Sequence, residues 1–376
     1  MIGGMYLAMT RHYFPGNNTP QGFYSYYNYI LGQREASRII CLKGGPGTGK
    51  STFLKNIGCQ LEQVGVGVDY LHCSADENSL DGILVSEKRI AIIDGTSPHV
   101  IDPKTPGAVD VILNFGDFWN DKMIGAEKDR IIEHNETCSR WYRIGYGYLQ
   151  SASAISKNMS MVQEEGIETS EVYGFASDVI QREYREYEIS MKPGHIKKLF
   201  VTAITPYGFY NGIKDVLAGI KKIYLINVPE GYRNQSLMQM MLEGAKYRGL
   251  DVWCCYCPMG PEDKIEHIII PRLSLAFITT NKWHDVEPWE LTDLGGEERE
   301  IIYLDVGDYQ SFCFTDANSR ILMELSSHYE DMLKAAVYAF SKAKENHDAV
   351  ETCYTGTMDF HAVNRKAKEI VDEILG

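Results

Sequence analysis

The sequence predicts an α/β protein made of two tandem halves, each a mainly parallel sheet flanked by helices. A short apolar run at residues 39–42 precedes a glycine-rich loop and a helical pattern, the order of strand, loop and helix in such a sheet. The string Thr-Pro-x-Gly-Phe-Tyr starts at Thr19 and again at Thr205, 186 positions later in a chain of 376 residues. A shift of nearly half the length indicates a tandem duplication. We therefore expect domains at residues 1–193 and 194–376.

The composition is that of an ordinary globular protein, with 44% hydrophobic and 23% charged residues. A net charge of −14 argues against a general nucleic-acid-binding surface and against an anionic membrane as partner. No apolar run reaches the length of a membrane span, and residues 1–14 lack the apolar core of a signal peptide. Nine cysteines without regular spacing are expected to be reduced thiols, which favours a cytoplasmic protein.

The loop at residues 44–52 fits the phosphate-binding pattern G-x-x-x-x-G-K-[ST]. Glycines allow successive N–H groups to point at phosphate oxygens, and the following helix adds the dipole of its N-terminus. We therefore expect a P-loop NTPase-like domain that binds the nucleoside triphosphate ATP together with Mg²⁺. The expected binding residues are Gly45, Pro46, Gly47, Thr48, Gly49, Lys50, Ser51 and Thr52.

Three residue types around this loop have defined roles in phosphoryl chemistry. Lys50 is expected to reach the β- and γ-phosphates, and Ser51 to ligate Mg²⁺. Asp94 ends an apolar run at residues 89–94, which is the pattern of a strand-end aspartate that holds Mg²⁺ through water. Lys50 is thus a predicted catalytic residue, and Ser51 and Asp94 are predicted metal ligands.

The residue that activates water is not evident beside Asp94, because a glycine follows it where many ATPases have a glutamate. Asp76 and Glu77 are the first candidates, since they follow a predicted strand at its carboxyl end, where α/β sheets bind ligands. Asp81 and Asp102 come second. A solvated loop carboxylate or a helix cap is the alternative interpretation of Asp76.

The second half repeats the pattern of the first but loses its chemistry. Residues 227–235 stand where the glycine-rich loop stood, with Tyr232, Arg233 and Asn234 in place of the last glycine, the lysine and the serine. Thr279 stands in place of the strand-end aspartate. Arg233 keeps a positive charge without the compact geometry of lysine. We therefore expect a pseudo-ATPase half that packs on the first as an internal pseudo-dimer.

Features present in both halves are interpreted as structural. His99 and the Gly116-Asp117 pair have counterparts downstream, and the repeated string at Thr19 is expected to form a turn and helix cap. The cysteines at 254–257 are expected to be buried strand thiols and not a metal cluster, because neighbouring strand residues face opposite sides. The aromatic residues at 23–29 are expected to form an amphipathic helix and not a base-stacking surface.

Each half ends in a helical stretch, at residues 121–190 and 316–376, that is expected to form a helical hairpin packed on or projecting from the sheet. Pro193-Gly194 breaks the helical pattern between the halves.

Together these motifs resemble an uncharacterised bacterial family of double P-loop ATPases over essentially the whole chain. The resemblance implies ATP binding and two NTPase-like halves. The second half of that family often has its own intact P-loop, and this sequence departs from the pattern at residues 227–235. The resemblance rests on Gly22-Phe23-Tyr24, residues 44–52, His72-Cys73-Ser74, Asp76, residues 79–82, residues 94–99 and residues 102–110.

Three functions remain open at this point. The first is an ATPase whose hydrolysis drives a conformational change between the halves. The second is a small-molecule or nucleoside kinase, with a loop at residues 76–81 and His99 lining an acceptor pocket. The third is a non-hydrolysing, ATP-dependent scaffold that binds a protein partner through its helical hairpins. In any of these, Arg233 could complete the first site only if the two loops face each other.

Overall fold

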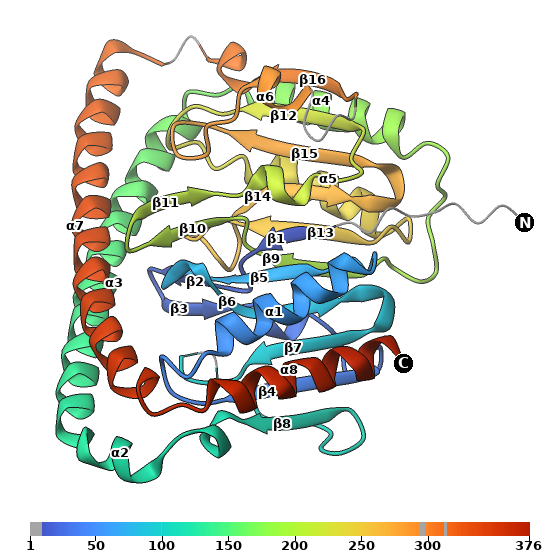
Figure 1. Cartoon of the computed structure of the whole chain (residues 1–376). Coiled ribbons are helices and arrows are strands. Elements are labelled where there is room, and N and C mark those ends of the chain that lie inside the picture. Colours follow the sequence, from blue (N-terminus) through green and yellow to red (C-terminus); the bar gives the residue numbers. More distant parts are fainter. Residues whose placement is uncertain (1–9, 99, 293–297, 312–313) are drawn as a thin grey trace, which may run out of the picture.

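The computed structural model describes residues 10–98, 100–292, 298–311 and 314–376, and it shows an α/β protein with two sheet-bearing halves (Figure 1). Short 3-10 turns connect several of the regular elements. The first half has strands β1 (Arg11–Tyr13), β2 (Gly16–Thr19), β3 (Gly22–Ser25), β4 (Arg38–Lys43), β5 (Asp69–Cys73), β6 (Asp76–Val85), β7 (Ile90–Asp94) and β8 (Asp110–Asn114). Its helices are α1 (Lys50–Gln63), α2 (Asp121–Ala126), α3 (Lys128–Glu164) and α4 (Thr169–Glu183).

The second half has strands β9 (Ile196–Leu199), β10 (Thr202–Thr205), β11 (Gly208–Asn211), β12 (Lys222–Asn227), β13 (Val252–Tyr256), β14 (Ile265–Ile270), β15 (Leu275–Thr280) and β16 (Glu300–Asp305). Its helices are α5 (Gln235–Lys246), α6 (Pro288–Thr292), α7 (Asp316–Thr355) and α8 (Phe360–Leu375).

The two six-stranded sheets have the same topology. The first has the order β1-β5-β6-β7-β4-β8, and the second has β9-β13-β14-β15-β12-β16. In each, only the third strand, β6 or β14, runs antiparallel to its neighbours. The expected mainly parallel sheet is therefore present in each half, and in each half it is mixed because of one antiparallel strand.

Two local predictions were wrong. Residues 76–81 are not a loop but the start of β6, because the apolar residues that follow are buried between β5 and β7 and extend the whole segment. The aromatic residues at 23–29 do not form an amphipathic helix. They form β3 and a 3-10 turn, since the turn before them pairs β3 with β2.

Each copy of the repeated string closes a two-stranded hairpin, β2–β3 or β10–β11. The Thr19 hydroxyl donates to the Gly22 carbonyl at 2.8 Å, and the Thr205 hydroxyl donates to the Gly208 carbonyl at 3.0 Å. The turn expected from the sequence is present, but it closes a hairpin and does not cap a helix.

The halves meet at equivalent residues. Phe14 and Phe200, which are 186 positions apart, exchange two backbone hydrogen bonds of 2.9 and 3.0 Å. Close by, the Asn17 side chain donates to the Thr202 carbonyl at 2.7 Å and accepts from the Ile204 amide at 3.2 Å. An element that pairs with its own repeat is the arrangement of an isologous dimer. The halves therefore pack as an internal pseudo-dimer.

The helices cross between the halves. The long helices α3 and α7 pack along each other beside both sheets (Figure 1). Helix α4 then packs on α5 of the second half, and α8 packs on α1 of the first half. The predicted helices exist, but the second arm of each hairpin covers the sheet of the other half. None of the described helices has the length and apolar character that a membrane span requires.

Candidate functional site

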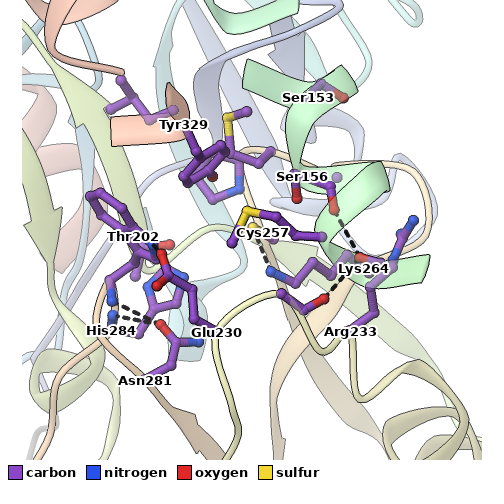
Figure 2. A pocket seen from close by; sticks show the side chains of 18 of the residues that line it. Ser153, Ser156, Thr202, Glu230, Arg233, Cys257, Lys264, Asn281, His284 and Tyr329 are labelled. Carbon is purple, nitrogen blue, oxygen red and sulfur yellow. Dashed lines mark hydrogen bonds between the residues drawn. The ribbon is translucent and has the colours of Figure 1, made fainter. Parts of the chain in front are cut away.

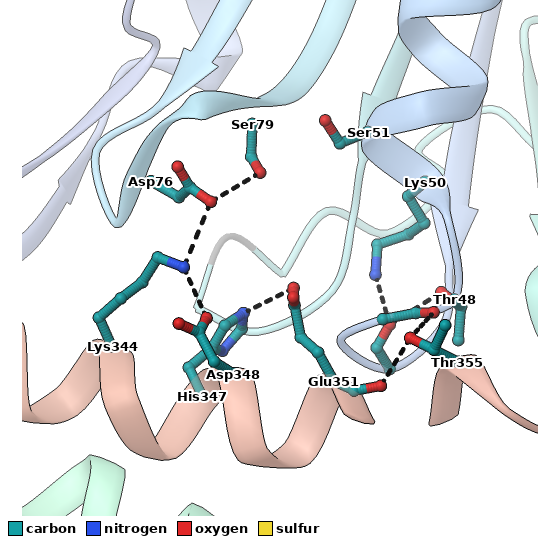
Figure 3. A network of polar contacts seen from close by, with 12 residues as sticks. Thr48, Lys50, Ser51, Asp76, Ser79, Lys344, His347, Asp348, Glu351 and Thr355 are labelled. Atoms are coloured by element: carbon teal, nitrogen blue, oxygen red, sulfur yellow. Dashed lines mark hydrogen bonds and ion pairs between the residues drawn. The ribbon is translucent and has the colours of Figure 1, made fainter. Parts of the chain in front are cut away.

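Polar side chains gather at two places in the molecule. One is a cavity of about 200 Å³ beside residues 229–233 of the second half (Figure 2). The other is a network around the glycine-rich loop of the first half (Figure 3). The two places are equivalent in the duplicated fold, because each loop follows the same strand of its sheet, β4 or β12.

The first loop leaves strand β4, which lies between β7 and the edge strand β8, and leads directly into α1. Gly47 and Gly49 have φ angles of 71° and 90°, the left-handed region that favours glycine. Within the described part of the chain, the N–H groups of residues 47–52 have no hydrogen-bond acceptor. Unpaired amides at a helix N-terminus are the groups that bind phosphate oxygens elsewhere.

Lys50 and Asp94 meet at this loop. The Lys50 ammonium donates to the carbonyls of Gly44 and Gly45 at 2.7 and 2.8 Å and lies 3.5 Å from Asp94 Oδ2. The other Asp94 oxygen accepts from the Thr96 amide at 2.9 Å. The side chains of Lys50 and Asp94 are 10% and 14% exposed, so both charges are partly shielded from water.

The other predicted binding residues have different surroundings. The Ser51 hydroxyl oxygen accepts from the Leu80 amide of β6 at 3.0 Å, which leaves its proton available to a further acceptor. Thr48 is buried, and its hydroxyl donates to the Gly45 carbonyl at 2.8 Å within the loop. Pro46 is half-buried in the loop, whereas Thr52 lies exposed on α1.

The C-terminal end of α7 covers the loop. The Thr355 hydroxyl donates to the Gly47 carbonyl at 3.2 Å, and the Tyr354 ring lies against Gly45. A methyl group on Gly47 would approach the Glu351 carbonyl oxygen to 2.3 Å. These glycines therefore have a packing role as well as their conformational one, because α7 could not approach a loop with larger side chains.

One face of α7 presents charged groups to the loop (Figure 3). Lys344 lies 3.4 Å from Asp76 Oδ2 and 2.5 Å from Asp348. Burial alone would lower the pKa of Lys344, but the hydrogen bond to Asp348 and the charge of Asp76 together outweigh it and raise the pKa. His347 lies 3.4 Å from Glu351 and lowers the pKa of the Glu351 carboxyl. The charges of Lys344 and Lys50 lower that pKa further. Both lysines are thus close enough to act on Glu351.

The two candidate carboxylates of the sequence have different positions. Asp76 is part of the network, because it accepts from Ser79 at 3.1 Å and pairs with Lys344. The Glu77 side chain forms no hydrogen bond or ion pair with any described residue. Its charge instead contributes to the raised pKa of Tyr210 in β11, after burial and Asp215.

The secondary candidates lie outside this network. Asp81 is buried and accepts from the Tyr27 hydroxyl at 2.8 Å, whereas Asp102 is exposed and pairs with Lys43 at 3.0 Å. His99 lies outside the described residues.

Sequence reasoning missed the α7 residues Lys344, His347 and Glu351. Their spacing of three, four and seven positions places them on one face of a helix, and that signal was available. What the spacing could not give is the place where this face docks, nearly 300 positions from the loop.

The second loop is covered in the same way by the other long helix. Ser160 of α3 donates to the Gly231 carbonyl at 2.8 Å, and Met159 lies against Gly231. Arg233 pairs with Asp263 of its own half at 2.8 Å. In contrast to the first loop, the Tyr232 amide is already bonded to the Pro229 carbonyl.

Comparisons of the chain with protein-family models, curated proteins and solved structures find no match.

Proposed function

We propose that the chain binds Mg-ATP at residues 44–52 and hydrolyses it, and that the second half is a pseudo-ATPase. One observation carries this proposal: unpaired amides of residues 47–52 stand beside Lys50 and Asp94 at the carboxyl end of two parallel strands. Ligands of α/β sheets bind at that edge.

The residues present fit the phosphates and the metal of Mg-ATP. The amides and Lys50 would hold phosphate oxygens, and the Ser51 hydroxyl and the Asp94 carboxylate would hold Mg²⁺. When bound, Mg²⁺ neutralises charge on the phosphates. Among the described residues, the Lys50 ammonium bonds to two loop carbonyls and lies near Asp94, so it can turn from these partners to a phosphate.

Residues from both halves would supply the remaining chemistry. Asp76 and Glu351 are carboxylates of the polar network beside the loop, and either could accept a hydrogen bond from an attacking water and so orient it. Lys344 adds a positive charge on the same side. Because Glu351 and Lys344 belong to α7, the site is complete only when the second half holds α7 against the first loop.

The test is phosphate release by the purified full chain with Mg-ATP and no added acceptor. Lys50→Ala should lose ATP binding, and Arg233→Ala, the change at the equivalent position, should bind ATP normally. Calorimetry should give one ATP per chain. These expectations follow because the second loop lacks the lysine, the serine and the strand-end aspartate.

Each other outcome assigns a different function. Phosphate transfer only with an added metabolite would indicate a kinase, and tight binding without turnover would indicate an ATP-dependent scaffold. Two ATP per chain would contradict the pseudo-ATPase half, and equal ATP binding by Lys50→Ala would contradict the assigned site.

A further inference from the structure

Three potential metal ligands converge in the second half, beside the cavity of Figure 2. The ligand atoms of Cys257, Glu266 and His284 all lie within 4.8 Å of one another. Cys257 follows β13, Glu266 lies in β14, and His284 lies in the loop after β15. The three residues are 3%, 1% and 6% exposed, so the protein shields the cluster from water.

The polar atoms of this cluster are only partly satisfied. Glu266 Oε2 accepts from the Thr202 hydroxyl at 3.2 Å, and Glu266 Oε1 is paired with His284 Nε2 at 2.5 Å. His284 Nδ1 has no hydrogen-bond partner among the described residues. Buried polar atoms without partners are costly, and a bound ion is one way to satisfy them.

We propose that Cys257, Glu266 and His284 bind a transition-metal dication of the zinc class. Sulfur, imidazole nitrogen and carboxylate oxygen together are ligands of Zn²⁺, whereas Mg²⁺ and Ca²⁺ prefer oxygen alone. Three protein ligands leave a fourth tetrahedral position, which would face the cavity. Binding converts the Cys257 thiol to a thiolate and releases its proton to solvent.

A thiol and a carboxylate occupy equivalent positions in both halves, so the duplicated fold itself places the two groups near each other. In the first sheet Leu71 pairs with Gly82, and in the second Cys255 pairs with His267. In each sheet a cysteine, Cys73 or Cys257, follows the first member of the pair by two positions. An acidic residue, Asp81 or Glu266, precedes the second member by one position. Burial, followed by the nearby charge of Asp81, raises the pKa of the Cys73 thiol, so these two groups also lie close together. This pairing of groups persists in the half that lost the residues of the phosphate loop.

Lys264 distinguishes the second half and competes for the same ligands. Its ammonium lies 3.5 Å from Cys257 Sγ and 3.7 Å from Glu266 Oε1 (Figure 2 shows Lys264 beside Cys257). A dication and an ammonium repel each other at such distances. The Lys264 side chain is 25% exposed, so it can turn into the cavity when the metal binds.

The experiment is titration of the chelator-treated full chain with Co²⁺ as a spectroscopic substitute, and with Zn²⁺ followed by elemental analysis. A thiolate ligand should give a sulfur-to-cobalt charge-transfer band, and Zn²⁺ should remain bound after dialysis. Cys257→Ser should abolish the band, and both Cys257→Ser and His284→Asn should weaken Zn²⁺ binding by at least about tenfold. Cys254→Ser, which changes a buried thiol of β13 outside the cluster, should change neither.

Lys264→Met provides a test that does not depend on removing a ligand. Loss of the competing charge should tighten Zn²⁺ binding, and circular dichroism verifies that each variant is folded. An equal charge-transfer band in folded Cys257→Ser, absence of retained Zn²⁺ in the wild-type chain, or unchanged Zn²⁺ affinity in Lys264→Met would overturn the proposal. Lys50→Ala should retain the metal, so failure of the nucleotide site and failure of the metal site are distinguishable.

Discussion

Lys50 belongs to the glycine-rich loop and Lys344 belongs to the polar network beside it, and only the position of Lys50 was predictable. The loop pattern fixes Lys50, Ser51 and, with a strand end, Asp94, because local backbone geometry places them. Through tertiary packing of α7, Glu351 lies against the loop and Lys344 lies beside Asp76, and no local pattern encodes either position. The positions of residues that depend on the local backbone were thus predictable, whereas residues supplied by a helix distant in sequence were missed.

We expect Lys344→Ala to lower kcat for phosphate release about 100-fold or more, while the Kd for ATP changes less than about threefold. The reason is that its charge would act mainly on the negative charge that develops during transfer. Steady-state rates and calorimetry separate the two effects, and Lys344→Arg should restore part of the rate. Lys334→Ala, at a 70% exposed side chain of the same helix, is the control. A parallel loss of binding and rate would indicate a structural role.

A second prediction concerns His72, whose pKa is lowered mainly by burial. A hydrogen bond to the Glu77 carbonyl opposes this shift, and the charge of His12 adds to it. Below about pH 6.5 the unfolded chain therefore takes up a proton that the folded chain resists. The free energy of unfolding should fall as pH decreases from there, by up to about 1.4 kcal/mol per pH unit from this group.

His72→Gln should reduce that pH dependence, and His361→Gln, on an exposed position of α8, should not. Urea unfolding at several values between about pH 6.5 and pH 5 measures the slope for each variant. Identical slopes in His72→Gln and the wild-type chain would contradict the assignment of this titration to His72.

At the scale of elements, the spacing of apolar residues predicted several helices and strands, but it did not always predict which part of the molecule each one contacts. Strands β4 and β7 and helix α7 were recognisable from their apolar patterns. Strand β6 was missed because its polar start resembles a loop, and pairing of that start with β5 overrides the local signal. The C-terminal end of α7 became part of the site because it packs on the loop of the first half, and the sequence of α7 alone does not indicate that contact.

The contact between α7 and the loop predicts the behaviour of Tyr354→Ala. The Tyr354 ring packs against Gly45 and lies 5.7 Å from the Trp119 ring, so it holds α7 over the loop. Without the ring, the loop should be open in a larger fraction of molecules, and ATP should associate about threefold to tenfold faster. Stopped-flow fluorescence with a labelled nucleotide measures this rate. Tyr338→Ala, at a 59% exposed residue of α7, is the control. Weaker binding by Tyr354→Ala would instead indicate that the ring supports the nucleotide.

At the scale of the whole molecule, the duplication was predictable and the exchange of helices was not. The repeated string revealed two halves, and the matching strand orders agree with it. The sequence does not say which sheet an amphipathic helix covers, because its apolar stripe fits either of two similar surfaces. Helix α8 buries Val363, Ile370 and Ile374 against α1 of the first half, and α4 buries Val172 and Val179 against the second. Each half is therefore completed by the other.

This exchange predicts that neither half folds alone. Residues 1–193 lack α8 and leave the apolar face of α1 uncovered, while residues 194–376 lack α4 over α5. Co-expressed halves should form a one-to-one complex that elutes with the full chain, and each half expressed singly should aggregate or bind a hydrophobic dye. A protease site inserted at Met191, which is fully exposed, is the matched test, because the nicked chain should keep its fold and remain associated. Cooperative unfolding of residues 1–193 alone, at the temperature of the full chain, would show that α8 is dispensable to the first sheet.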